Sequence, residues 1–208
     1  MGATIRLFHI SLATLLIAGG VILPQTLGMM QSDYHWTDQY LSELGASGAS
    51  NAAIMNSFGF LPVGLLWLAA ISILVLRLSG GVLMVLGGLL LAGTSVSYVG
   101  AFLFPCDAGC PLEGSEKQLM HNLLGVVGYL TTPLGLVFVA IRFLSAKSTA
   151  LALLTFAAAF LATIGFLMMA SSVDAPLKGA WQRLADFTLF FWMFAVAFFI
   201  RDSSQHSI

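Results

Sequence analysis

Charged side chains are scarce in this sequence of 208 residues. Asp, Glu, Lys and Arg make up 8% of it, whereas about 25% is usual for a soluble domain, and hydrophobic residues make up 59%. A soluble fold of this size could not bury so much apolar surface, so the solvent must be lipid. The net charge is -1 and no basic stripe is present, which argues against nucleic-acid binding because phosphates require clustered cations.

Motifs of the common catalytic and cofactor sites are also missing. We find no glycine-rich phosphate loop after a strand, no nucleophile elbow and no paired histidines suited to haem. The chain has four histidines, and only His35 and His121 are expected on the outer side of the membrane, which excludes a three-histidine zinc site there. We therefore expect no cofactor.

Six apolar runs are long enough to cross the hydrocarbon core of a membrane, which takes about 20 residues as a helix. None of them alternates as a barrel strand would, so helices are expected. The sequence predicts an all-α, polytopic membrane protein, with one integral membrane domain over residues 1–208 built as a six-transmembrane-helix bundle. The expected spans are approximately 7–29, 55–76, 81–104, 119–143, 149–171 and 180–200.

Lysine and arginine are unevenly divided between the two sides of this bundle. If the N-terminus is cytoplasmic, the inner side holds Arg6, Arg77, Arg142, Lys147 and Arg201, and the outer side holds Lys117, Lys178 and Arg183. Cytoplasmic loops of membrane proteins carry the excess of positive charge. We therefore expect a protein integral to the plasma (inner) membrane, with both termini cytoplasmic.

The first outer loop, residues 31–53, is too long for a plain connector. Its segment 37–44 can form a short helix with one apolar side, ended by Gly45 as a C-cap. Trp36 and Tyr40 suit the level of the lipid headgroups, where amphipathic aromatic side chains collect. We expect a short interfacial helix in this loop.

Small residues recur at helical spacing in the third and fourth spans, which indicates close approach of two helices. They are Gly87, Gly88, Gly93, Ser97 and Gly100 in the third span, and Gly125, Gly128, Thr132 and Gly135 in the fourth. His121 falls on the same stripe as the small residues of the fourth span. Its side chain is therefore expected to point into the bundle.

The chain has two cysteines, Cys106 and Cys110, in its second outer loop. Such a pair can form a disulfide or serve as two metal ligands. C-x3-C with one histidine eleven residues later matches no common zinc pattern, and a thioredoxin-like pair would require C-x-x-C. We expect a disulfide and no metal, because an extracytoplasmic loop is oxidising in most bacteria.

Ionisable residues near membrane depth are costly and usually face a cavity or a partner. Those expected beneath the outer surface are Glu43, Asp107, His121, Arg183 and Asp186, which form the candidate ligand-binding set. Arg183 can pair with Asp186 three residues later, or bind a lipid phosphate or carboxylate with its planar fork. His121 either caps and packs its span or acts as an acid or base with Asp107 or Glu43.

Three blocks of sequence resemble a known family. LSELGASGASNAAIMN, FPCDAGC with MHNLLGVVGYL, and GAWQRLADF are similar to the prokaryotic membrane family named domain of unknown function 998, over nearly the whole chain. The resemblance implies a compact multi-helix membrane protein with shared polar residues on one side, here Glu43, Asp107, His121 and Arg183. The SELG block is also distantly similar to eukaryotic membrane families of the FRAG, DRAM and SFK type, which implies a link to lipid remodelling. The cysteine pair lies outside the family pattern, which argues against a catalytic role for it.

Three functions remain open from the sequence. The first is an integral membrane protein with an outward-facing polar pocket that binds a lipid or amphiphile headgroup through Arg183 and His121, or that serves as an accessory subunit. The second is a hydrolase-like, lipid-modifying enzyme at the outer leaflet, with His121, Asp107 and Glu43 as candidate catalytic residues. The third is a small transporter, which is disfavoured because the span centres lack charges. The expected partners are membrane lipids and not nucleic acid, and the sequence does not decide between a protein partner, a homo-oligomer and neither.

Overall fold

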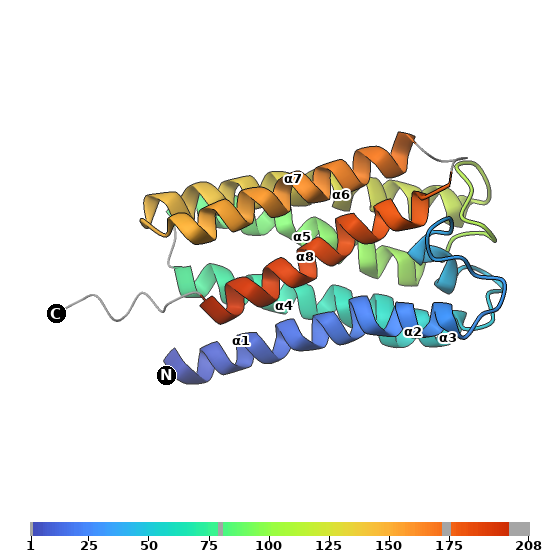
Figure 1. Ribbon diagram of the computed structural model, residues 1–208, viewed down its shortest axis with the longest axis horizontal. Helices are drawn as coiled ribbons and strands as arrows, with labels where there is room; N and C mark the ends of the chain where they lie inside the picture. The colour runs from blue at the N-terminus through green and yellow to red at the C-terminus, as the bar shows by residue number, and fades with distance from the viewer. Residues whose placement is uncertain (1, 79–80, 172–175, 200–208) are drawn as a thin grey trace.

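The computed structural model describes residues 2–78, 81–171 and 176–199, and within these ranges it is helical and contains no strand. Six of its helices are long and apolar enough to cross a membrane. They run side by side as one elongated bundle (Figure 1). This confirms the predicted six-helix membrane bundle. Arg201, used in the orientation argument, and position 200, the expected end of the sixth span, lie outside the described residues.

Two of the six spans are built from consecutive helical segments. The first joins α1 (Gly2–Ile17), the π-helical segment η1 (Ala18–Ile22) and α2 (Leu23–Met29), and the second joins α3 (Ala52–Ile54), the π-helical segment η3 (Met55–Phe60) and α4 (Leu61–Leu78). The other four spans are α5 (Gly81–Leu103), α6 (Glu116–Ser145), α7 (Thr149–Ser171) and α8 (Lys178–Phe199). A short 3₁₀ helix, η2 (Leu41–Gly45), lies in the first connection.

The α-helix that follows each π-helical segment has a proline at its second position, Pro24 in α2 and Pro62 in α4. Proline has no amide hydrogen and crowds the preceding turn of a helix. The widened turn absorbs this defect, since the amides of Leu23 and Leu61 bond five residues back, to the carbonyls of Ala18 and Asn56. The two widened turns also pack against each other.

The six spans form a closed ring, in the order α1, α4, α5, α6, α7, α8 and back to α1. The interface between α5 and α6 is the most extensive. A Cβ atom on Gly135 would lie 2.8 Å from the carbonyl oxygen of Gly87 and from the amide nitrogen of Leu91, so only glycine allows this approach. The predicted small-residue contact between the third and fourth spans is therefore confirmed.

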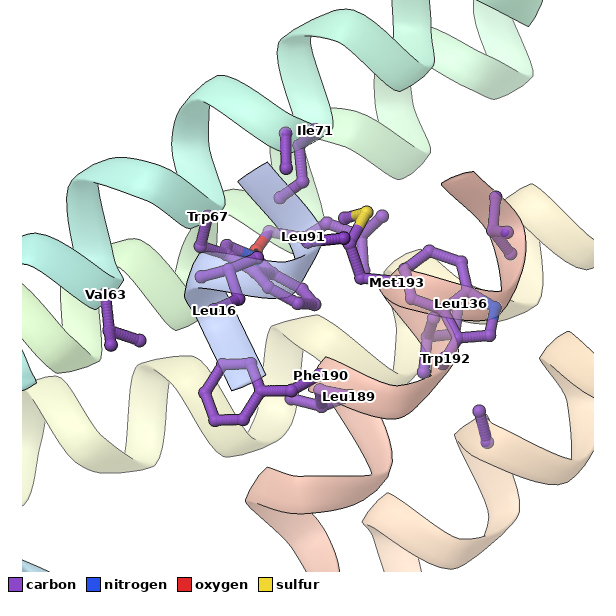
Figure 2. Packing of buried hydrophobic residues seen from close by; sticks show 14 of the residues in the cluster. Leu16, Val63, Trp67, Ile71, Leu91, Leu136, Leu189, Phe190, Trp192 and Met193 are labelled. Atoms are coloured by element: carbon purple, nitrogen blue, oxygen red, sulfur yellow. The ribbon is translucent and has the colours of Figure 1, made fainter. Parts of the chain in front are cut away.

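Large side chains fill the middle of the ring (Figure 2). The indole nitrogen of Trp67 donates to the carbonyl of Leu91 at 2.8 Å, and its rings meet Phe190 edge-on at 5.9 Å between centroids. Phe190 in turn packs edge-on against Tyr98 at 5.7 Å. Tyr98 marks the point where this apolar core meets the polar groups described below.

One end of the bundle holds residues 30–51, residues 104–115 and the start of α8 (Figure 1). We call it the loop end. At the opposite end α1 begins and α8 finishes, as an even number of spans requires.

The first connection differs from its prediction. Residues 36–39 form a turn and a bend, and the 3₁₀ helix η2 that begins at Leu41 is buried, with Leu41 1% and Leu44 0% exposed. Both leucines belong to the main hydrophobic core, so η2 packs inside the loop end and does not lie on its surface. The expected interfacial helix over residues 37–44 is thus replaced by a shorter, buried turn of helix, because its leucines find apolar partners among the spans.

Candidate functional site at the loop end

All five candidate residues belong to elements that meet at the loop end. Glu43 lies in η2, Asp107 between α5 and α6, and His121 near the start of α6. Arg183 and Asp186 lie in the second and third turns of α8. Their contacts separate residues that hold the loops from residues that line a cavity.

Arg183 is 3% exposed and its guanidinium group binds other parts of the protein. Its five acceptors are Gln25 Oε1 at 2.8 Å, the carbonyls of Trp36 at 2.8 Å, Gln39 at 3.2 Å and Gly179 at 3.0 Å, and the hydroxyl of Tyr34. No hydrogen bond or ion pair within 4.0 Å joins Arg183 to Asp186, although the structure describes both residues. The expected ion pair is absent because the carbonyls of the first connection take its place.

The Tyr34 hydroxyl extends this network. It donates to the carbonyl of Tyr40 at 2.9 Å and accepts from Arg183. Burial raises the pKa of Tyr34 above its ordinary value of 10.0, and the positive charge of Arg183 opposes that shift. Tyr34 therefore remains protonated at neutral pH and can make both bonds.

The backbone of the first connection also docks onto the start of α8. The amide of Ala180 donates to the carbonyl of Thr37 at 2.9 Å, and the amide of Leu177 donates to the carboxylate of Asp38 at 3.1 Å. A Cβ atom on Gly179 would lie 2.0 Å from the carbonyl oxygen of Gln39, so a side chain there would push the loop away. Together with Arg183, these contacts fix residues 34–41 on α8.

Glu43 caps η2. One carboxylate oxygen accepts from the amide of Tyr40 at 2.9 Å, and the other accepts from the side-chain amide of Gln39 at 3.0 Å. Such a bond satisfies a backbone donor at the start of a helix that has no partner within it. The structure therefore places Glu43 in the loop framework.

Asp107 organises the second connection. Its carboxylate accepts from the backbone amide and from the hydroxyl of Ser115, each at 2.8 Å. These two bonds lower the pKa of Asp107 below its ordinary value of 3.8. Ser115 in turn caps α6 by accepting from the amide of Gln118 at 3.3 Å.

His121 bonds through Nδ1 to the carbonyl of Phe104 at 3.0 Å. The carboxylates of Glu43 and Asp107 bond within their own loops, and in the described part of the chain neither bonds to His121. The acid and base group suggested by the sequence is therefore not assembled in this conformation. His121 instead faces a cavity.

That cavity has a volume of about 40 Å³ and lies between η2, α5, α6 and α8. Its polar lining consists of Ser42, Ser97, Tyr98, His121, Tyr129, Gln182 and Asp186. A Cβ atom on Gly125 would have no neighbour within 4 Å, so this glycine leaves part of the space open. Of the five candidates, only His121 and Asp186 line the cavity.

Asp186 is the carboxyl group of this cavity. It is 5% exposed, and its carboxylate accepts from the hydroxyl of Tyr129 at 3.3 Å. The Tyr98 hydroxyl lies beside the same carboxylate, outside ideal hydrogen-bond geometry. The side-chain amide of Gln182 donates to Tyr129 at 3.2 Å. The polar wall continues to Thr94 and Thr132, whose hydroxyls are 2.8 Å apart, around a smaller cavity of about 10 Å³.

Sequence reasoning missed the two tyrosines and Gln182. Their helical spacing contains a usable signal, since Tyr129 lies eight residues after His121 and Gln182 lies four before Asp186. Residues four apart share a helix face. The two faces meet only because α6 and α8 converge on the same interior, which the spacing alone does not reveal.

The two cysteines are joined by a disulfide, as predicted. Cys106 is 0% and Cys110 7% exposed. The Cys110 sulfur lies 3.5 Å from the hydroxyl of Ser42, a residue of the cavity wall. The disulfide thus closes a turn within the second connection, and the amide of Ser47, which donates to the carbonyl of Cys106 at 2.8 Å, joins that turn to the first connection.

Comparison with known proteins identifies the family. The family described as Protein of unknown function (DUF998) matches residues 10–198. The chain belongs to this family. No curated protein matches the chain, and no solved structure does. The predicted membership is confirmed, while the distant similarity to eukaryotic lipid-linked families stays a prediction.

In this DUF998 protein, the three blocks that carry the family resemblance converge at the loop end. The SELG block supplies η2, the MHN block supplies His121, and the WQRLAD block supplies Gln182, Arg183 and Asp186. Arg183 and Glu43 shape the loop, and Asp186 and His121 face the space beneath it. The arrangement suits binding of a small polar group under a fixed cover.

Proposed function

We propose that this integral membrane protein binds the headgroup of a membrane lipid or amphiphile at Asp186 and catalyses no reaction. The headgroup that fits is one that donates hydrogen bonds, such as a hydroxyl or an ammonium group. The observation that supports this most is the nearly buried carboxylate of Asp186 in the wall of a polar cavity. An ionisable group at membrane depth costs several kcal/mol in the least favourable positions, so it usually serves a ligand, a pathway or a partner.

The chemistry of the lining favours a donor as the ligand. A carboxylate offers about four acceptor positions, and the two tyrosine hydroxyls can fill only two of them. No lysine or arginine is among the described residues that line the cavity. A phosphate would therefore meet the acceptor oxygens of Asp186 with no lysine or arginine to neutralise it, whereas an ammonium or hydroxyl group could donate to those oxygens.

The size of the cavity limits what can enter. About 40 Å³ leaves room for about three water-sized groups. The end of a headgroup fits, and the rest of the amphiphile would stay in the bilayer. Leu41 and Ser42 form part of the wall, so the first connection covers the cavity. From the sequence, Arg183 was expected to contact the headgroup. In this proposal Arg183 instead holds the first connection over the cavity.

We place the loop end on the outer face of the plasma membrane and both termini in the cytoplasm. The support is the distribution of cations, with Arg6, Arg77, Arg142 and Lys147 at the end away from the loops. Cytoplasmic ends of spans favour such residues. Under this placement the cavity would receive ligands from the outer leaflet.

Lipid retention tests the proposal. The protein in mild detergent is mixed with equal amounts of phosphatidylethanolamine, phosphatidylglycerol and phosphatidic acid of matched acyl chains, and retained lipids are counted by native mass spectrometry. We expect retention of the ammonium and hydroxyl lipids over phosphatidic acid, and a loss of about tenfold or more in Asp186→Asn, equal to about 1.4 kcal/mol. Asp107→Asn, a carboxylate at the same end but outside the cavity wall, is the matched control. Equal retention by wild type and Asp186→Asn would overturn the proposal.

A further inference from the structure

The cysteine pair and His121 form a second cluster at the loop end. One possible ligand atom from each, the two sulfurs and a ring nitrogen, lie within 4.8 Å of one another. We propose that Cys106, Cys110 and His121 bind a thiophilic divalent metal ion, of the class of Zn²⁺, when the disulfide is reduced. This proposal does not rest on lipid binding, since its ligands do not include Asp186.

The hydrogen bond of His121 prepares it for this role. A carbonyl oxygen can only accept, so the Nδ1 atom that contacts Phe104 at 3.0 Å carries the proton of the neutral ring. Nε2 then carries the lone pair that a metal requires. Histidine ligands in metal sites usually donate their second ring nitrogen to a carbonyl or a carboxylate in this way, which fixes the tautomer and the orientation of the ring.

The turn between the cysteines brings them within chelating distance. Their Cα atoms are 5.1 Å apart, and the amide of Cys110 donates to the carbonyl of Asp107 at 2.9 Å. Gly109 and Cys110 both have positive φ, 78° and 45°, which closes the turn. Two zinc-bound thiolates at about 2.3 Å from the metal are about 3.8 Å from each other, a separation that rotation of these side chains can reach.

The surroundings favour a metal once the thiols are free. Both cysteines are nearly buried, and an unpaired thiolate there would lack solvent to stabilise it. The Ser42 hydroxyl, 3.5 Å from the Cys110 sulfur, is in place to donate to a thiolate or to occupy a fourth position. Two cysteines and one histidine with one open position match the ligand set of a known class of zinc sites.

The redox step determines when the site exists. A dithiol reductant gives two electrons and two protons to the disulfide, becomes a disulfide itself and leaves Cys106 and Cys110 as thiols. The metal ion then displaces the two thiol protons, so binding releases protons and weakens as the pH falls. The oxidised protein has no thiolate and cannot bind the metal through sulfur.

The sequence alone argued against this site, because a histidine eleven residues after C-x3-C fits no common spacing. The structure brings the three residues together because the carboxylate of Asp107 holds Ser115 at the start of α6. The first turns of α6 then return His121 to the cysteines. A ligand set assembled by a loop and a helix start leaves no regular pattern in the sequence.

Cobalt titration tests the proposal. The full chain, freed of any affinity tag, is reduced with dithiothreitol, desalted without oxygen and titrated with Co²⁺, whose thiolate charge-transfer absorption reports sulfur ligation. We expect this band to saturate near one equivalent, to be absent from oxidised protein and to be lost when Zn²⁺ is added. Failure of the reduced wild type to show the band would overturn the proposal, whatever the variants do.

Two histidine variants identify the nitrogen ligand. His121→Gln retains a donor for the Phe104 carbonyl and loses the ring nitrogen, so we expect the affinity for Co²⁺ to fall tenfold or more. His35→Gln changes an exposed histidine of the first connection and should leave the affinity unchanged. Equal affinities of these two variants would exclude His121 as a ligand. Lipid retention by the oxidised protein is measured separately, so failure here does not affect the proposed function.

Discussion

Replacing Arg183 by alanine should release the first connection from α8. The substitution removes one donor from three backbone carbonyls, one glutamine oxygen and the Tyr34 hydroxyl. Single hydrogen bonds to a charged group contribute about 1.5–3 kcal/mol, but five bonds to one side chain do not add. Removing Arg183 leaves neutral acceptors and no unpaired charge. Each acceptor that water cannot reach costs about 1–3 kcal/mol, and because these costs do not add fully we expect the free energy of unfolding to fall by about 3–5 kcal/mol.

Thermal unfolding in detergent measures this loss. For a chain of this length about 1 kcal/mol corresponds to about 2–4 °C, so Arg183→Ala should lower the Tm by about 6–20 °C. It should also speed chymotrypsin cleavage within residues 34–40, which contain Tyr34, Trp36 and Tyr40. Arg142→Ala is the matched control, because among the described residues the half-buried Arg142 donates one hydrogen bond, to the carbonyl of Leu78 at 3.0 Å, which contributes about 1.5 kcal/mol.

The opposite result would identify a different role for Arg183. If Arg183→Ala unfolds within about 2 °C of Arg142→Ala while lipid retention falls, the guanidinium serves the ligand and not the loop. The assignment of Arg183 to the framework would then be wrong.

Three further predictions concern packing, pH and redox state. Gly135→Val should destabilise the protein by about 1–3 kcal/mol in thermal unfolding through overpacking of α5 on α6, whereas Gly125→Ala, which meets open space, should be tolerated. Because hydrogen bonds lower the pKa of folded Asp107 below 3.8, its stabilising contribution is complete above pH 3.8 and is lost as the pH falls through the folded pKa. On acidification, the Tm of Asp107→Asn should accordingly fall less than the Tm of the wild type. Parallel curves of Tm against pH for the two proteins would refute this assignment. Alkylation of unreduced, denatured protein should label neither Cys106 nor Cys110, and mass measurement showing two labelled thiols would contradict the disulfide.

The spans could be predicted because lipid imposes a simple rule. A helix of about 20 apolar residues is the shortest that crosses the hydrocarbon core, and such runs are visible without knowledge of packing. The start of α6 was placed three residues late, at 119 in place of Glu116, because Ser115 caps the helix within a polar stretch. The π-helical segments and the burial of η2 depend on contacts between spans, which hydropathy does not report.

The site was harder to predict for a related reason. Residue type identified Asp186 and His121, since ionisable groups at membrane depth require an explanation. Spacing also suggested that Arg183 pairs with Asp186, but it could not show that loop carbonyls far away in the sequence bind the guanidinium first. Tyr98 and Tyr129 were missed because tyrosine in a span usually indicates the headgroup level.

A high-resolution structure of the protein extracted with its native lipids tests the central proposal most directly. We predict density for a hydroxyl or ammonium group within hydrogen-bond distance of the Asp186 carboxylate, between Tyr129 and Gln182. A cavity that contains only water, with lipid headgroups held elsewhere on the bundle, would contradict it.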